Sequence, residues 1–167
     1  MTTQQQVEAR YPYMFAGKNV GISVPCGWIE IFATLCDEID ALLGDNKHGF
    51  HWAQCKEKFG SARWYWDMAG VESALRMDLI APDGGASLTK PAKSSQPEGV
   101  PLVERLSALI RAAEQETSHS CIVCGERGVN DHGNVRGGGW YLTLCPEHAN
   151  ERAAGHLPPI YFEDHGV

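Results

Sequence analysis

The feature that most constrains this chain is a glycine-rich stretch, residues 121–148, that carries two closely spaced pairs of metal-ligand residues. Two residues separate the members of each pair, Cys121 with Cys124 and Cys145 with His148. A tetrahedral zinc site takes four nitrogen or sulfur ligands, so the two pairs together predict one complete Cys3His site for Zn²⁺. A complete set is typical of a structural ion, because a catalytic zinc keeps one position open for water.

The residues around the two pairs predict how this site is assembled. A glycine after the first pair permits a tight backbone turn, and "GGGWYLTLC" reads as a glycine turn followed by a strand. The proline and glutamate between Cys145 and His148 suit the first turn of a helix. The expected order is a knuckle, a hairpin and a helix, which resembles a treble-clef zinc finger. His119 and His132 remain open as replacements for His148 as the fourth ligand.

The other three cysteines, Cys26, Cys36 and Cys55, are isolated in the sequence and are expected to be ordinary core residues. A redox role for the Cys-x-x-Cys pair is disfavoured, because no thioredoxin-like strand and helix surround it. The N-terminus lacks the basic and apolar regions of a secretion signal, and no apolar run reaches the roughly 20 residues of a membrane span. We therefore expect a cytoplasmic protein, in a compartment that keeps thiols reduced.

The N-terminal half predicts a β-hairpin covered by a helix. Residues 27–43 repeat apolar side chains at helical spacing. Residues 50–55 and 62–67 alternate aromatic side chains on either side of a charged connection that contains a glycine, a pattern typical of an antiparallel hairpin. We expect its tryptophan face, with Trp64 and Trp66, to pack on the helix, because a two-stranded sheet alone is marginally stable in water.

The remaining segments give weaker signals. Residues 1–25 read as an irregular arm, and residues 71–80 fit either a short helix or a strand. Residues 81–100 are rich in Pro, Gly, Ser and Ala, which favours a flexible loop or linker. Residues 101–117 predict a second helix that opens with a proline and carries an apolar stripe.

Together these segments predict an α+β chain, in which a helix-covered antiparallel β-hairpin or small sheet precedes a C-terminal treble-clef-like zinc finger. Residues 1–80 would form the helix and aromatic hairpin core, and residues 81–100 a flexible insertion or linker. Residues 101–167 would form the second helix and the zinc-finger module packed on the core.

Several stretches resemble a group of small proteins encoded by bacteriophages and prophages. The matching pieces are "RYPYMF", "CGWIEIFATLCDEI", "QCKEKFGSARWYW", and "CIVCG" followed by "GWYLTLC", and they span most of residues 10–148. The "KEKFG" string before an aromatic strand is the most specific. The chain departs from the group in a shortened segment before Gly27 and in an apparent insertion at 81–100. The resemblance implies a mobile-element origin and a bacterial host cell, and it implies no particular activity.

Charge narrows the class of partner. The formal net charge is −7 and the isoelectric point is about 5.4. Proteins that neutralise many phosphates carry an excess of Lys and Arg, so general nucleic-acid binding is disfavoured. An acidic balance suits solubility or a basic partner.

The leading hypothesis is a non-enzymatic binding protein that engages a host or phage protein. Its predicted partner-binding residues lie in and beside the hairpin connection: Lys56, Lys58, Phe59 and Arg63. An aromatic residue beside a glycine in a turn either folds back on its own chain or anchors a partner. The phage-like resemblance suggests that the partner belongs to a bacterial defence system, which the protein would block.

Two other functions remain open. A small nucleic-acid-binding regulator would use the zinc finger, with Arg127 and Arg136 near phosphates. A treble-clef nuclease would use His132 beside Asn134, although such sites need further histidines in the following helix.

Overall fold

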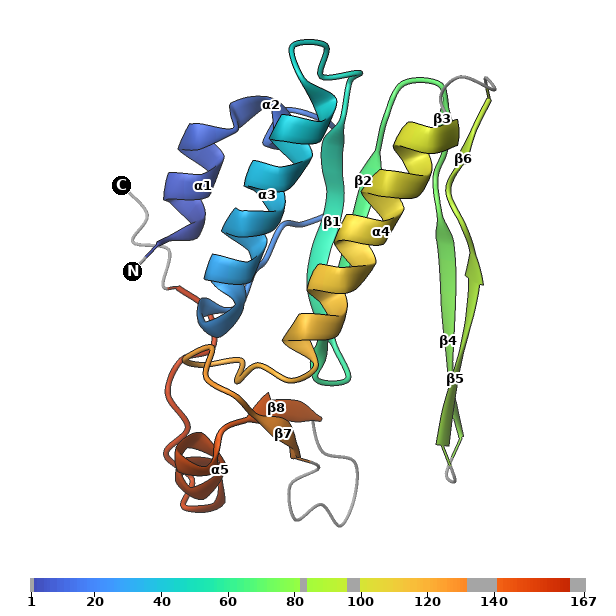
Figure 1. Cartoon of the computed structure of the whole chain (residues 1–167). Helices are drawn as coiled ribbons and strands as arrows, with labels where there is room; N and C mark the ends of the chain where they lie inside the picture. Colours follow the sequence, from blue (N-terminus) through green and yellow to red (C-terminus); the bar gives the residue numbers. More distant parts are fainter. Residues whose placement is uncertain (1, 82–83, 96–99, 132–140, 163–167) are drawn as a thin grey trace.

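The computed structural model describes residues 2–81, 84–95, 100–131 and 141–162. Two helices lie side by side over one face of a β-hairpin, and a second two-stranded ribbon extends beside that hairpin (Figure 1). A small C-terminal module lies beneath the ends of both helices and carries the last short strands and helix (Figure 1). The chain is therefore α+β, as the sequence predicts. No helix in these ranges is long and apolar enough to cross a membrane.

The two long helices match their predicted positions. Helix α3 (Ile29–Leu43) follows a short 3-10 turn, η1 (Cys26–Trp28), and ends at Gly44, whose φ of 62° suits a residue without a side chain. Helix α4 (Val100–Thr117) buries Val103, Leu106, Ile110 and Thr117. These buried positions recur at intervals of three, four and seven residues, so one stripe of the helix faces the core.

The predicted hairpin is present, with longer strands and a tighter turn than the sequence pattern suggests. Strand β1 (His51–Lys58) pairs antiparallel with β2 (Ser61–Asp67). Only Phe59 and Gly60 lie between the strands, at φ values of 54° and 76°. Two positive φ angles are what a two-residue type I′ turn requires. The charged residues expected in the connection therefore extend β1 instead.

Aromatic rings fill the space between the hairpin and α3. The Phe32 ring of α3 lies 5.2 Å from the Trp52 ring and 5.1 Å from the Trp64 ring, between centroids. Phe50 lies 5.8 Å from Trp66 in a stacked arrangement. The tryptophan face of the hairpin therefore packs under the helix, as predicted.

The N-terminal segment is more ordered than the irregular arm that its sequence suggests. It forms α1 (Gln4–Arg10), capped reciprocally by Thr3 and Gln6, and α2 (Pro12–Phe15). The irregular-arm prediction is wrong here because the cap and the burial of Val7 and Met14 stabilise helices that are too short to show a clear apolar period.

Other parts of the chain cover both outer edges of the hairpin. Residues 20–23 run along the edge of β1 and exchange backbone hydrogen bonds with Ala53 and Cys55. Along β2, the Ala62 N–H donates to Thr117 Oγ1 at 2.8 Å, and the Trp64 N–H donates to Glu114 Oε1 at 2.7 Å. Covered edges do not offer backbone groups to further strands, which lowers the risk of aggregation.

The segment expected to be a loop forms part of a second ribbon. Strand β3 (Val71–Glu72) pairs with β6 (Lys93–Ser94), and β4 (Leu75–Ala81) pairs with β5 (Gly84–Lys90). The ambiguous 71–80 segment is thus strand except at Ser73 and Ala74, and the loop prediction for 81–100 is wrong at β5 and β6. Whether a segment forms a strand depends on the segment that pairs with it, so the Gly-, Ser- and Thr-rich composition of β5 did not predict a strand.

The C-terminal module contains β7 (Val129–Asp131), its antiparallel partner β8 (Leu142–Leu144) and α5 (Pro146–Ala153). Hydrogen bonds tie it to the rest of the chain, among them one from the Gly27 N–H to the Ile122 carbonyl at 2.9 Å. The Trp28 indole N–H donates to the Ser120 carbonyl at 2.9 Å, the Cys26 N–H donates to the Ile160 carbonyl at 2.7 Å, and Thr143 Oγ1 donates to the Gly60 carbonyl at 2.6 Å. The buried apolar side chains of the module and of the helix-covered hairpin form one continuous core.

Candidate metal centre

The first ligand pair sits in a tight knuckle. The Cys121 N–H donates to the Glu126 carbonyl at 2.6 Å, and the Gly125 N–H donates back to the Cys121 carbonyl at 2.8 Å. Gly125 has a φ of 81°, a left-handed conformation that glycine adopts without steric cost. These contacts turn the backbone so that both sulfurs of the pair face the same point.

The second ligand pair is presented by the start of α5. Cys145 is the N-cap residue, Pro146 is the first helical residue, and the Ala149 N–H donates to the Cys145 carbonyl at 2.9 Å. Proline suits the first helical position because its missing N–H would have no partner inside the helix. Residues three apart lie on one side of a helix, so Cys145 and His148 point together toward the knuckle.

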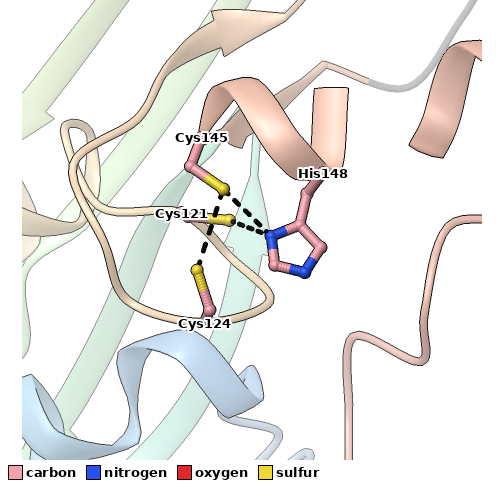
Figure 2. A group of neighbouring side chains, drawn as sticks. All are labelled: Cys121, Cys124, Cys145 and His148. Atoms are coloured by element: carbon pink, nitrogen blue, oxygen red, sulfur yellow. Dashed lines mark hydrogen bonds between the residues drawn. The ribbon is translucent and has the colours of Figure 1, made fainter. Parts of the chain in front are cut away.

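The four donor atoms converge on a single point, as Figure 2 shows. The three thiol sulfurs and a ring nitrogen of His148 all lie within 4.8 Å of one another. The Cys124 and Cys145 sulfurs are 3.8 Å apart, and His148 Nδ1 lies 3.5 Å from the Cys121 sulfur and 3.0 Å from the Cys145 sulfur.

These spacings fit a zinc ion. Bond lengths of about 2.3 Å to sulfur and about 2.0 Å to nitrogen place tetrahedral ligands roughly 3.8 Å apart for two sulfurs and roughly 3.5 Å apart for sulfur and nitrogen. Two of the three observed distances agree with these values, and the third is shorter by about half an ångström. A disulfide would need sulfurs about 2.0 Å apart, and all six cysteines are free thiols.

The acid–base properties of the thiols also suit a divalent cation. Burial raises the pKa of the Cys121 thiol, but N–H groups of Cys145, Cys124 and Val123 outweigh it and bring the pKa below its ordinary value. Partial burial and the neighbouring Cys121 sulfur raise the pKa of Cys124 to about 12. Several thiolates therefore cannot accumulate here without a positive charge among them, which a bound cation would supply.

A carboxylate lies behind the histidine ligand. Glu151 Oε2 is 3.7 Å from His148 Nε2, on the opposite side of the ring from the sulfurs. This oxygen is buried and has no hydrogen-bond partner among the described residues. A carboxylate at Nε2 favours the tautomer that carries its proton there, which leaves the lone pair of Nδ1 for a metal.

We expect Glu151→Gln to weaken zinc binding by roughly tenfold, because the amide holds the ring less strongly than the carboxylate does. Competition with a chromophoric chelator would measure the affinity. Glu147→Gln, on the same helix but exposed, is the matched control and should leave the affinity unchanged. Equal affinities for the two variants would contradict a role for Glu151.

The other candidate ligands do not join this cluster. Among the described residues, the group of convergent donors contains His148 and not the exposed His119. His132, Asn134 and Arg136 lie outside the described residues. The nuclease and nucleic-acid hypotheses depend on these residues, so the structure does not test them there. Arg127 is exposed at the end of the knuckle.

The predicted partner-binding residues lie at the tip and on the outer face of the β1–β2 hairpin. The Phe59 ring in the turn packs edge-on against Tyr141, 6.4 Å between centroids, and the Lys58 ammonium lies 5.2 Å from the Phe59 centroid. Lys56 and Arg63 are directly opposite each other on the two strands. The hairpin tip thus contacts the C-terminal module, and the role of these four residues in partner binding stays a prediction.

Two features of the centre were missed at the level of sequence. Glu151 follows His148 by three residues, a spacing that signals a neighbour on a helix and could have been recognised. The contact of Gly27 with Gly125 could not, because the two glycines are 98 positions apart in the sequence; a Cβ added to Gly125 would lie 2.7 Å from the Gly27 carbonyl oxygen.

No protein-family description, curated protein or solved structure matches this chain. The functional conclusion therefore depends on the chemistry of the site and on the surfaces that the fold presents.

Proposed function

We propose that this protein is a non-enzymatic binding protein whose C-terminal module is braced by one structural Zn²⁺ ion. The observation that carries the proposal is the convergence of three thiols and one imidazole within 4.8 Å. Four protein ligands complete the coordination of a tetrahedral zinc, so no position is left for a substrate or a reactive water.

The metal would fasten the knuckle to the start of α5. Bound zinc supplies strong bonds to the four ligands and neutralises the charge of the thiolates. Among the described residues of the module, the fully buried apolar side chains are chiefly Ile122, Leu142 and Leu144. Thr143, between Leu142 and Leu144, donates a hydrogen bond to the Gly60 carbonyl, so the bound metal would also fix the tip of the β1–β2 hairpin.

The partner is proposed to be a protein of the bacterial host or of the phage itself, and a bacterial defence protein is the first candidate. The resemblance to phage-encoded proteins supports this choice. The chain's six free cysteines suit the reducing cytoplasm, where such an encounter would occur. The net charge of −7 supports a protein partner over a nucleic acid.

The test combines metal analysis with affinity capture on one purified sample. We expect about one zinc ion per chain, lost in the Cys145→Ser variant and retained in the Cys26→Ser control. A tagged protein expressed in bacteria should retain a defined host protein at a fixed ratio, and the Cys145→Ser variant should lose it. Capture of nucleic acid alone, or Mg²⁺-dependent nuclease activity, would overturn the proposal.

A further inference from the structure

The four ligands of the candidate metal centre differ in their exposure to solvent. Cys121 and Cys145 are 0% and 2% exposed, and the His148 side chain is 12% exposed. Cys124 is the exposed member of the group. A small reagent dissolved in water would therefore meet the ligand set first at Cys124.

A second thiol lies close to the exposed one. The Cys124 and Cys145 sulfurs are 3.8 Å apart, and a dashed line joins them in Figure 2. A disulfide needs the two sulfurs about 2.0 Å apart, so a small movement of these side chains would allow the bond to form. One cysteine belongs to the knuckle and the other is the N-cap residue of α5. This pair is therefore different from the Cys-x-x-Cys pair, for which the sequence disfavours a redox role.

The arrangement has the properties of a redox-sensitive cysteine pair. A cysteine that binds zinc is a thiolate, and an accessible thiolate beside a second cysteine is the form that peroxides oxidise most readily. Cys36 and Cys55 are buried outside the ligand set, and Cys26 lies outside it and is partly buried. Among the six cysteines, Cys124 thus combines exposure, metal binding and a neighbouring thiol.

We propose that the metal centre is a redox switch, in which peroxide oxidises Cys124, a disulfide forms between Cys124 and Cys145, and the zinc ion is released. This inference rests on the structural zinc ion of the proposed function and adds the regulation of that site. Disulfides in a reducing compartment are mostly transient and redox-sensing, which suits a reversible switch.

The chemistry proceeds in two steps. The Cys124 thiolate attacks peroxide, the O–O bond breaks, hydroxide leaves, and Cys124 becomes a sulfenic acid. The Cys145 thiolate then attacks the Cys124 sulfur, the S–S bond forms, and a second hydroxide leaves. The two sulfurs together lose two electrons, and peroxide gains both.

The disulfide removes two of the four ligands. The two that remain, Cys121 and His148, do not complete a tetrahedral site, so the ion leaves in hydrated form and the Cys121 thiolate takes up a proton from water. Reduction of the disulfide by a thiol regenerates both thiolates and allows zinc to bind again.

Loss of the ion would loosen the contact between the C-terminal module and the tip of the β1–β2 hairpin. Thr143 Oγ1 donates to the Gly60 carbonyl at 2.6 Å, and the Phe59 ring packs edge-on against Tyr141. Thr143 and Tyr141 precede the ligand Cys145 by two and four positions, so the bound ion helps to hold them in place. Because Phe59 is one of the predicted partner-binding residues, oxidation would alter the surface on which the proposed binding depends.

The test treats the zinc-loaded, full-length protein with hydrogen peroxide and measures the released ion with a chromophoric chelator. We expect about one zinc ion per chain to be released, with a Cys124–Cys145 disulfide identified by mass spectrometry of the digested protein. The melting temperature should fall by roughly 5 °C or more, and dithiothreitol with added zinc should restore it. Cys26→Ser should behave like the natural protein.

Two matched variants separate the role of Cys124 from that of zinc binding. Cys124→His replaces one zinc ligand with another that forms no disulfide, so it should bind zinc and release it at least about tenfold more slowly in peroxide. Cys121→His makes the same change at a buried position and keeps the reactive pair, so it should release zinc like the natural protein. Zinc content and melting temperature before oxidation show whether each variant is loaded and folded.

Three results would overturn the switch: no release of zinc by peroxide, release without a Cys124–Cys145 disulfide, or equal rates of release from the two histidine variants. The first two are measured on the natural protein and do not depend on the folding of a variant. In all three cases the structural zinc ion and the binding function stand.

Other results concern the proposed function. If the switch operates as expected but the full-length protein captures no protein in cells, the switch stands and the binding function is wrong. A natural protein that binds no zinc would overturn both.

Discussion

Removing the metal is expected to unfold the C-terminal module while the helix-covered hairpin stays folded. Structural zinc contributes on the order of 10 kcal/mol to the folding of small modules, far more than the few buried side chains of this module can replace. The aromatic contacts of Phe32 with Trp52 and Trp64 involve none of the four ligands, so we expect them to persist without the metal. We expect chelation to lower the melting temperature by roughly 10 °C or more.

Thiol alkylation followed by mass spectrometry would locate this unfolding along the chain. Cys121, Cys124 and Cys145 should become reactive when zinc is removed. Cys36 and Cys55 should stay protected, because both are buried and burial raises the pKa of Cys36 to about 12 and that of Cys55 well above its ordinary value. A thiol with a raised pKa holds little of the reactive thiolate at neutral pH.

Two outcomes would contradict this expectation. If chelation changed neither the melting temperature nor the alkylation pattern, the four ligands would not hold a structural metal. If all cysteines became reactive together, the module and the hairpin core would unfold as one unit. Cys26→Ser, which alters a half-buried thiol outside the ligand set, is the control for the loss of a cysteine as such.

The second large effect is expected where the knuckle meets the start of α3. Gly125→Ala should destabilise the protein by at least about 2 kcal/mol more than Gly155→Ala does. The two glycines have nearly the same φ, 81° and 80°, so both substitutions place a side chain at a positive φ. A Cβ at Gly125 would lie 2.7 Å from the Gly27 carbonyl oxygen, whereas one at Gly155 would meet no atom within 4 Å.

Denaturant unfolding of the two zinc-loaded variants would give the difference directly, with metal content measured on the same samples. Gly27→Ala tests the same contact by adding a side chain to the other glycine. A Cβ there would overlap the Cys121 carbonyl oxygen, and Gly27 has no positive φ, so backbone strain does not contribute. Equal stability of Gly125→Ala and Gly155→Ala would show that the knuckle is not packed tightly against η1.

Local patterns in the sequence were sufficient for the main elements. The apolar spacing of residues 27–43 and 101–117 predicted α3 and α4, and the aromatic alternation around Trp64 predicted the hairpin and its buried face. These predictions succeed because helical and strand periods depend on neighbouring residues. The two Cys/His pairs likewise marked the candidate metal centre, since ligand spacing within each pair is also local.

Contacts between distant segments escaped the same reasoning. Strand β5 could not be predicted without its pairing partner β4. Strand pairing is a backbone interaction, and the composition of one segment does not indicate which segment it pairs with. The N-terminal helices depend on a cap and on burial against the core. Phe59 could have pointed to solvent, and only the position of Tyr141 shows that it packs on its own chain.

The sequence by itself determined the ligand types, their spacing and the periods of the longest helices and strands, because each of these properties is set within a few residues. Only the tertiary structure decided that the knuckle rests on Gly27, that Glu151 lies behind His148, and that Lys56 lies opposite Arg63. These features depend on strand register and on the close approach of segments far apart in the chain, and packing of the whole core fixes both.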